Sequence, residues 1–338
     1  MKKCSYPLFF TIYNARQQRY DGANEYIDGR NNMDKSIRGY LFAHFTGETP
    51  QGEQVYFSLS GDGLHWQDLN SGQPVLCSDI GERGVRDPFL LRSVLDGQYY
   101  LIATDLRIAN GKGWGVAQRA GSTRLILWKS ADLLHWSAPW SFDTRISGAG
   151  CAWAPEAIYD PAENAYLVFW AARVQEPGEA DGKHRIYAAH TGDFVRFTPP
   201  AKYIERAQDV IDTTIVEDQG VFYRFSKDET NKNIVLDCGA ALAGGFKTVD
   251  APVLSTLMGV EGPAAFRLKD GRWCLLVDQF AAGKGYMPLV CDDLAGGVFA
   301  PLPESAYSMG AGLKRHGSVL PLNAEEFARV GAHYKAEK

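Results

Sequence analysis

The sequence predicts an all-β protein, a five-bladed β-propeller whose ring is closed by strands from the N- and C-terminal parts of the chain. Two observations lead to this prediction. Short aromatic and β-branched runs recur along the chain, and two different short motifs each recur five times in alternation. Helical periodicity is scarce before residue 324. We therefore expect less than about a tenth helix, against roughly a third in an average protein.

The runs have the composition of antiparallel strands. They include Tyr99–Ala103, Tyr166–Trp170 and Val221–Phe225, each bounded by Gly, Asp or Asn. Aromatic and β-branched side chains favour the pleated, half-buried surface of a sheet, and the flanking residues favour turns. These segments therefore predict strands rather than helices.

The first repeated motif is a turn that ends in an aromatic residue. Its five copies are Ser60–Trp66, Ser130–Trp136, Thr191–Phe197, Leu242–Phe246 and Leu294–Phe299. In the first three copies a Ser or Thr followed by an Asp can bond the backbone of its own turn, and the closing aromatic can pack back on the sheet.

The second motif places a polar residue at the head of an apolar run. Its five copies are Arg86–Leu90, Ala154–Ile158, Ile211–Ile215, Glu261–Ala265 and Arg315–Val319. The heads lie at residues 87, 156, 212, 261 and 316, so the repeat is about 50 to 70 residues long. Two series that alternate at this spacing indicate five radial sheets.

We predict a single catalytic domain over residues 1–338, with an N-terminal segment (1–38), the propeller (39–322) and a C-terminal tail (323–338). Strands at 40–45 and 54–58 should join a strand at 318–320, because ring closure removes open sheet edges. Residues 14–38 are interpreted as a loop or crossing segment, and residues 324–338 as a short terminal helix.

Composition excludes several classes of function. The 338 residues carry a net charge of −5, with no basic excess that would neutralise phosphates, so we expect no nucleic-acid partner. No stretch of 18 apolar residues exists, so no membrane span is predicted. The six cysteines include no CxxC pair, which disfavours a zinc site. No clear signal peptide is present, and a cytoplasmic location is expected.

The five heads should converge on one functional site. In a propeller the first strand of every blade lines the central channel, and all five start at the same end. The heads supply Asp87, Glu156, Asp212, Glu261 and His316. Each residue alone would be an ordinary turn residue, but their recurrence in phase with the repeat favours function. Crowded carboxylates can divide into a protonated acid and an ionised base, as glycosidic bond cleavage requires.

The motifs together resemble glycoside hydrolase family 43. They are, in order, Arg-Asp-Pro (86–88), Trp-Ala-Pro-Glu (153–156), Ile-Asp-Thr (211–213), Glu-Gly-Pro (261–263) and Arg-His-Gly (315–317). The resemblance runs from about Gly39 to Leu322 and implies an inverting enzyme on a five-bladed propeller.

The resemblance also implies roles. Asp87 matches the general base, Asp212 the carboxylate that tunes the acid's pKa, and Glu261 the general acid. The matched substrate-binding residues are Trp153, Arg86, Glu156, Arg315 and His316. No cofactor is expected for the chemistry. A structural calcium ion in the channel, held through water near His316, is compatible with the family.

The sequence departs from the family pattern at two positions. The family usually has Asp where this chain has Glu156, and Pro where Thr213 follows Asp212. Because a full pair of strands precedes the Arg-Asp-Pro motif, Glu48 is an alternative candidate for the base.

These observations predict an inverting exo-glycosidase that acts on terminal pentoses of plant-type oligosaccharides or polysaccharide side chains. An α-L-arabinofuranosidase is favoured. A β-xylosidase or a galactan-active enzyme of the same family is one alternative, and a glycan-binding propeller without activity is another. The retaining fructan enzymes are disfavoured, because their Asn-Asp-Pro and Glu-Cys segments are absent. The sequence leaves the oligomeric state open.

Overall fold

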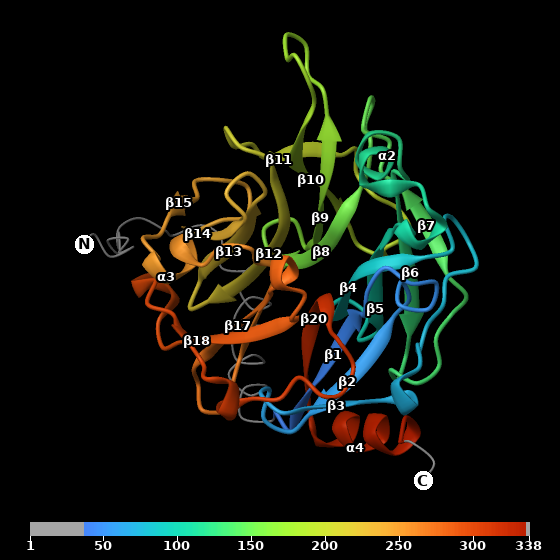
Figure 1. The fold of residues 1–338 in the computed structure, drawn as a ribbon, viewed down its shortest axis with the longest axis vertical. Coiled ribbons are helices and arrows are strands. Elements are labelled where there is room, and N and C mark those ends of the chain that lie inside the picture. The colour runs from blue at the N-terminus through green and yellow to red at the C-terminus, as the bar shows by residue number, and fades with distance from the viewer. Residues whose placement is uncertain (1–36, 336–338) are drawn as a thin grey trace, which may run out of the picture.

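The computed structural model describes residues 37–335, which form five four-stranded antiparallel sheets arranged around one axis (Figure 1). This confirms the predicted five-bladed β-propeller. Strands make up 45% and helices 12% of the structure, so the helical share slightly exceeds the expected tenth. Short helical turns in the loops account for part of this excess.

Blade 1 contains strands from both parts of the chain. From the inside outward it consists of β20 (Arg315–Leu322), β1 (Gly39–Phe45), β2 (Tyr56–Ser60) and β3 (Trp66–Asp68). β20 pairs antiparallel with β1 from Leu322 opposite Gly39 to Arg315 opposite Phe45. The predicted closure of the ring is therefore confirmed.

The other four blades follow the chain from the inside outward. Blade 2 is β4 (Val85–Arg92), β5 (Tyr99–Asp105), β6 (Arg124–Ser130) and β7 (Trp140–Asp143). Blade 3 is β8 (Trp153–Asp160), β9 (Ala165–Val174), β10 (Lys183–Thr191) and β11 (Ala201–Ile204). Blade 4 is β12 (Val210–Asp218), β13 (Val221–Asp228), β14 (Asn233–Gly239) and β15 (Lys247–Thr248). Blade 5 is β16 (Glu261–Arg267), β17 (Trp273–Asp278), β18 (Tyr286–Cys291) and β19 (Ala300–Pro301).

Helices lie between strands or after them. The α-helices are α2 (Gly113–Arg119), α3 (Pro252–Thr256) and α4 (Ala324–His333). The 3₁₀ turns are η1 (Asn70–Gly72), η2 (Ile108–Asn110), η3 (Phe280–Ala282), η4 (Leu294–Gly296) and η5 (Glu304–Ala306). Among the residues described, no helix has the length and apolarity needed to cross a bilayer.

The predicted terminal helix is confirmed as α4. Asn323 and Glu326 form a capping box at its start, which satisfies backbone N–H groups that have no partner within the helix. Val330 is buried in the core between blades 1 and 2, and Phe327 packs against that core. Of the predicted segment 14–38, all but residues 37 and 38 lies outside the described part of the chain.

The core consists of five apolar clusters, one between each pair of neighbouring blades. Leu41 and Leu101 belong to the cluster of blades 1 and 2, for example, and Phe42 and Leu276 to the cluster of blades 5 and 1. Both faces of each middle strand are therefore covered, which explains why strands such as β1 and β5 are apolar without alternation. The inner strands of neighbouring blades also contact one another all around the ring.

The repeated turns joining the third and fourth strands have the predicted bonds. The Ser60 hydroxyl accepts the N–H of Gly63, and Asp62 accepts those of Leu64 and His65. Asp132 and Asp193 make the equivalent bonds in blades 2 and 3. These local bonds fix the outer turns at the end of the propeller opposite the strand heads.

Candidate active site

The inner strands share a backbone irregularity near their heads. In blades 2 to 5 the pairing register shifts at Arg86–Phe89, Trp153–Glu156, Ile211–Thr213 and Glu261–Ala264. In blade 1, Arg315 and Gly317 pair with consecutive residues of β1, so His316 is the extra residue. A β-bulge of this kind leaves one residue unpaired and turns its side chain in a new direction.

The bulge residues in blades 2 to 5 adopt positive φ angles. They are Asp87 (53°), Ala154 (48°), Asp212 (48°) and Gly262 (53°). A left-handed conformation is costly for a residue with a Cβ, and such strain concentrates at functional sites. The equivalent heads are therefore 87, 154, 212, 262 and 316. This corrects the sequence alignment, in which Glu156 and Glu261 were treated as equivalent to Asp87.

Three of the predicted residues meet at the head end of the channel. Nδ1 of His316 lies 3.4 Å from Oδ1 of Asp87 and 3.8 Å from Oδ1 of Asp212. The N–H of Gly262 donates to Oδ2 of Asp212 at 3.2 Å, which joins this group to the strand of Glu261. The structure thus brings Asp87, Asp212, Glu261 and His316 into one site, as the repeat predicts.

Asp87 is oriented by a threonine that the sequence analysis missed. The Thr104 hydroxyl donates to Oδ2 of Asp87 at 2.7 Å and accepts the N–H of Ala154 at 2.7 Å. One side chain therefore links β4, β5 and β8 and leaves Oδ1 of Asp87 facing His316.

Asp212 is buried, and its burial has a chemical consequence. Desolvation raises the pKa of the Asp212 carboxyl to about 6, although the nearby charges of His316 and Lys227 oppose the shift. The negative charges of Glu261 and Asp87 act in the same direction as desolvation. Asp212 can therefore hold a proton at mildly acidic pH.

Glu261 has the opposite environment. Its Oε2 accepts from Nζ of Lys227 at 2.7 Å, and its Oε1 accepts from a terminal guanidinium nitrogen of Arg315 at 3.0 Å. Burial alone would raise the pKa of the Glu261 carboxyl, but the charges of Lys227, Arg315 and His316 outweigh it and place the pKa below the usual range. Lys227 and Arg315 therefore favour the ionised form of Glu261 in the free protein.

The cations are themselves fixed by other carboxylates. Nε of Arg315 donates to Asp278 at 2.6 Å, and Nζ of Lys227 lies 2.7 Å from Glu229. Lys227 is only 2% exposed, and its ammonium lies 4.2 Å from the centroid of the Phe280 ring. A lysine so deeply buried in the middle of a blade is stable only with such partners.

Glu156 and Arg86 are both buried. Glu156 is 4% exposed, and burial first and the charge of Asp212 second raise its carboxyl pKa well above the usual value. A terminal nitrogen of Arg86 donates to Glu53 at 3.1 Å and lies 3.7 Å from Glu48. Glu48, the alternative base, is thus placed beside Arg86. The binding roles predicted for Glu156 and Arg86 stay predictions.

Aromatic rings line one side of the site. Trp153 is half-buried and stacks on His184, with ring centroids 5.2 Å apart. The rings of Trp153 and Trp114 meet edge to face at 85°, with their centroids 5.9 Å apart. Trp153 therefore belongs to a group of rings next to Ala154, whose N–H is bonded to Thr104. Its role as a wall of the sugar pocket stays a prediction.

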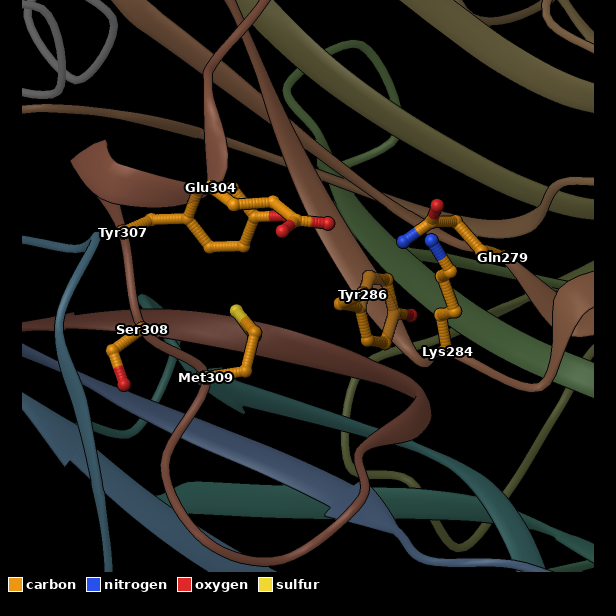
Figure 2. A pocket seen from close by; sticks show the side chains of 7 residues that line it. All are labelled: Gln279, Lys284, Tyr286, Glu304, Tyr307, Ser308 and Met309. Carbon is orange, nitrogen blue, oxygen red and sulfur yellow. The ribbon is translucent and has the colours of Figure 1, made fainter.

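A cavity of about 320 Å³ lies between blade 5 and the connection from β19 to β20 (Figure 2). It is lined by Gln279, Lys284, Tyr286, Glu304, Tyr307, Ser308 and Met309. The Tyr286 hydroxyl donates to the carbonyl of Gly262 at 2.6 Å and accepts the N–H of Gly317 at 3.0 Å. The cavity wall is thus bonded to the two strands that carry Glu261 and His316.

The residues around His316 do not fit a directly bound cation. Within residues 37–335 no group of three or more His, Cys, Asp or Glu side chains is arranged to hold a metal ion. The ring nitrogen Nδ1 of His316 instead faces Asp87 and Asp212.

The family described as "Probable glycosyl hydrolase domain", which is related to glycoside hydrolase family 43, matches residues 35–328. A curated relative is an α-L-arabinofuranosidase from Bifidobacterium longum subsp. longum, 30% identical over 292 residues. The match covers 72% of this chain and 27% of that protein, so the chain spans about a quarter of its relative's length.

Solved structures with the same fold include enzymes of several specificities. An endo-1,4-β-xylanase from Bacteroides thetaiotaomicron matches with a TM-score of 0.53 and 16% identity, over 82% of this chain and 93% of that one. A putative exo-β-1,3-galactanase from Bifidobacterium bifidum matches with a TM-score of 0.52 and 13% identity, over 82% and 90%. At these identities the similarity shows the fold alone.

Proposed function

Because the chain belongs to the family 43-related glycosyl hydrolases, we propose that it is an inverting exo-glycosidase that removes terminal α-L-arabinofuranosyl residues from oligosaccharides or polysaccharide side chains. The observation that carries the proposal is the meeting of Asp87, Asp212 and Glu261 around His316 and Gly262. The B. longum arabinofuranosidase supports the choice of sugar.

Asp87 is proposed as the general base. Thr104 occupies one of its oxygens, so the other can accept a proton from a water that attacks the anomeric carbon. In an inverting enzyme this water attacks from the face opposite the leaving group, and the bond breaks in one displacement.

Glu261 is proposed as the general acid, which must deliver a proton to the leaving oxygen. In the free protein its carboxylate is ion-paired to Lys227 and Arg315, so only a minor fraction carries the proton at neutral pH. The negative charge of Asp212 opposes this effect, and its removal should lower the protonated fraction further.

A second assignment has its own observation in favour. Asp212, whose pKa is raised to about 6, holds a proton more readily than Glu261 does. In that assignment Asp212 would be the acid, and Glu261 with its two cations would stabilise charge. A series of leaving groups distinguishes the two roles.

Loss of the true acid should slow substrates with poor leaving groups by roughly 100-fold or more, while nitrophenyl glycosides, whose leaving group needs little protonation, should change much less. Glu261→Gln and Asp212→Asn would be compared on nitrophenyl and alkyl α-L-arabinofuranosides. The variant that loses activity selectively on the alkyl substrates identifies the acid.

The proposed function is tested by following product configuration with proton NMR. The enzyme should release the β-anomer first from an α-linked substrate, and Asp87→Ala should abolish turnover on every substrate because no other group activates the water. Initial release of the α-anomer would disprove inversion. Parallel assays on nitrophenyl arabinofuranoside, xyloside and galactoside test the sugar, and EDTA should leave the rates unchanged because carboxylates fill both roles.

A further inference from the structure

The connection between β5 and β6 places a short helix at the head end of the propeller. β5 ends at Asp105, opposite the start of β4, so the connection leaves the sheet where the site lies. It contains α2, which Figure 1 labels near β6 and β7. Ala117 of α2 is fully buried. The N–H of Gly121 donates to the carbonyl of Gly150 at 2.8 Å, and Arg119 pairs with Asp181 at 3.2 Å. These contacts join the connection that carries α2 to the segment before β8 and to the loop between β9 and β10.

α2 carries a tryptophan whose orientation is fixed although much of it stays in solvent. Trp114 is 44% exposed. The guanidinium carbon of Arg86 lies 4.8 Å from the centroid of a Trp114 ring, and Trp153 meets the same side chain edge to face. Burial alone would not select this arrangement, because a large apolar surface remains in water.

The support beneath Trp114 is rigid. Arg86 is 4% exposed, packs 4.4 Å from the Phe45 ring centroid and donates to Glu53. Glu53 is fully buried and also accepts the N–H groups of Ile108 and Ala109, in the same connection as α2. The buried Arg86–Glu53 ion pair therefore fixes the guanidinium that contacts Trp114. Glu53 also fixes the backbone of the connection that carries Trp114.

The position of Trp114 between the buried part of the site and solvent determines which sugar of a substrate could contact it. Arg86 precedes Asp87 in β4 and is buried, whereas Trp114 lies over Arg86 on its solvent side. In an exo-acting site the terminal sugar occupies the closed part of the pocket, and the rest of the substrate extends toward solvent. A sugar ring stacked on the Trp114 side chain would thus belong to the leaving group.

Resting on the proposed function, we propose that Trp114 is an aromatic platform for the sugar on the leaving-group side of the cleaved bond, a pyranose of the chain that bears the terminal residue. The apolar C–H face of a pyranose stacks on an indole, while its hydroxyl groups remain in water. Trp114 then selects the polymer or oligomer and not the sugar released.

The test separates the platform from the catalytic pocket. Trp114→Ala should lower kcat/KM roughly tenfold or more on arabinofuranosyl-substituted xylo- and galacto-oligosaccharides. It should change kcat/KM on α-L-arabinofuranosyl fluoride less than twofold, because fluoride has no sugar on the leaving side. Trp114→Phe should keep most of the activity on both. Val116→Ala, a second exposed apolar residue of α2, is the matched control and should alter neither.

A binding measurement makes the result independent of turnover. By calorimetry, unbranched xylo- or galacto-oligosaccharide should bind Asp87→Ala protein at least tenfold more tightly than the Asp87→Ala/Trp114→Ala double variant. Equal losses on the fluoride and the oligosaccharides would overturn the platform, and so would unchanged oligosaccharide affinity. If the wild-type protein cleaves no arabinofuranoside, the proposed function fails, while the affinity comparison still decides the role of Trp114.

Discussion

Asp212 and Glu261 lie on neighbouring inner strands and are joined through the N–H of Gly262, yet the fold treats their charges in opposite ways. Asp212 lies near two carboxylates and a histidine at the head end of the channel, and desolvation raises its pKa to about 6. Glu261 faces two cations that lower its pKa despite its burial. A position near the propeller axis therefore does not determine whether a carboxylate is protonated. The charged side chains that contact it from other strands determine this.

The difference is also one of stability. Glu261 compensates the charge of a lysine that has almost no access to water. Asp212, in contrast, is itself a charge that folding removes from water, and the N–H of Gly262 and the charges of His316 and Lys227 do not offset that cost. One carboxylate should thus stabilise the propeller at neutral pH, and the other should destabilise it.

The largest expected effect concerns Glu261. Glu261→Gln leaves the Lys227 ammonium buried with Glu229 as its remaining close carboxylate, and should reduce the free energy of unfolding by roughly 3 kcal/mol at pH 7. Because a lowered pKa contributes stability that is lost as pH falls through it, the loss should fade in strong acid. Urea unfolding monitored by tryptophan fluorescence measures both.

The matched variant for this measurement is Lys227→Met in the Glu261→Gln background, which removes the unpaired ammonium. It should recover part of the lost stability. If Glu261→Gln unfolds at the same urea concentration as the wild type, the Glu261–Lys227 ion pair does not stabilise the fold. The claim that Glu261 stabilises the propeller at neutral pH would then be wrong.

Asp212→Asn should change the free energy of unfolding in the opposite direction to Glu261→Gln. The raised pKa means that the folded protein holds this proton more tightly than the unfolded chain, so stability is lost as pH rises from about 4 through about 6. Asn keeps an acceptor for Gly262 without the charge. The variant should therefore gain on the order of 2 kcal/mol at pH 7 and almost nothing at pH 4. A loss of stability at pH 7, measured by urea unfolding, would contradict the desolvation of Asp212.

The sequence predicted the propeller because its signals are local. Turn motifs such as Ser60–Trp66 bond their own backbone, and apolar strands such as Tyr99–Asp105 report burial on both faces. The convergence of Asp87, Asp212 and His316 followed from the symmetry of the repeat. These features need only the order of residues along one blade.

What the sequence missed depends on contacts between blades. Lys227 lies in β13, but its partner Glu261 begins β16 in the next blade. Thr104 and Trp114 act across blades 2 and 3. A lysine within the run Val221–Asp228 was a visible signal, since such a position is usually apolar, yet no spacing along the chain identifies its partner.

The smallest effect is a shift of the pH profile, and it sharpens the comparison most. If Glu261 is the acid, the alkaline limb of kcat/KM reports its pKa in the free enzyme. Asp212→Asn removes a neighbouring negative charge and should move that limb to lower pH. Lys227→Met removes a neighbouring positive charge and should move it to higher pH, by about one unit in each case.

The two shifts would be measured on α-L-arabinofuranosyl fluoride and on an alkyl arabinofuranoside, because only the second substrate depends strongly on the acid. Lys202→Met is the matched control, since Lys202 pairs with Glu176 and Glu205 on blade 3, away from the channel. Opposite shifts assign the limb to Glu261. Disappearance of the limb in Asp212→Asn would instead assign it to Asp212, because the group whose pKa burial raises would then be the one that delivers the proton.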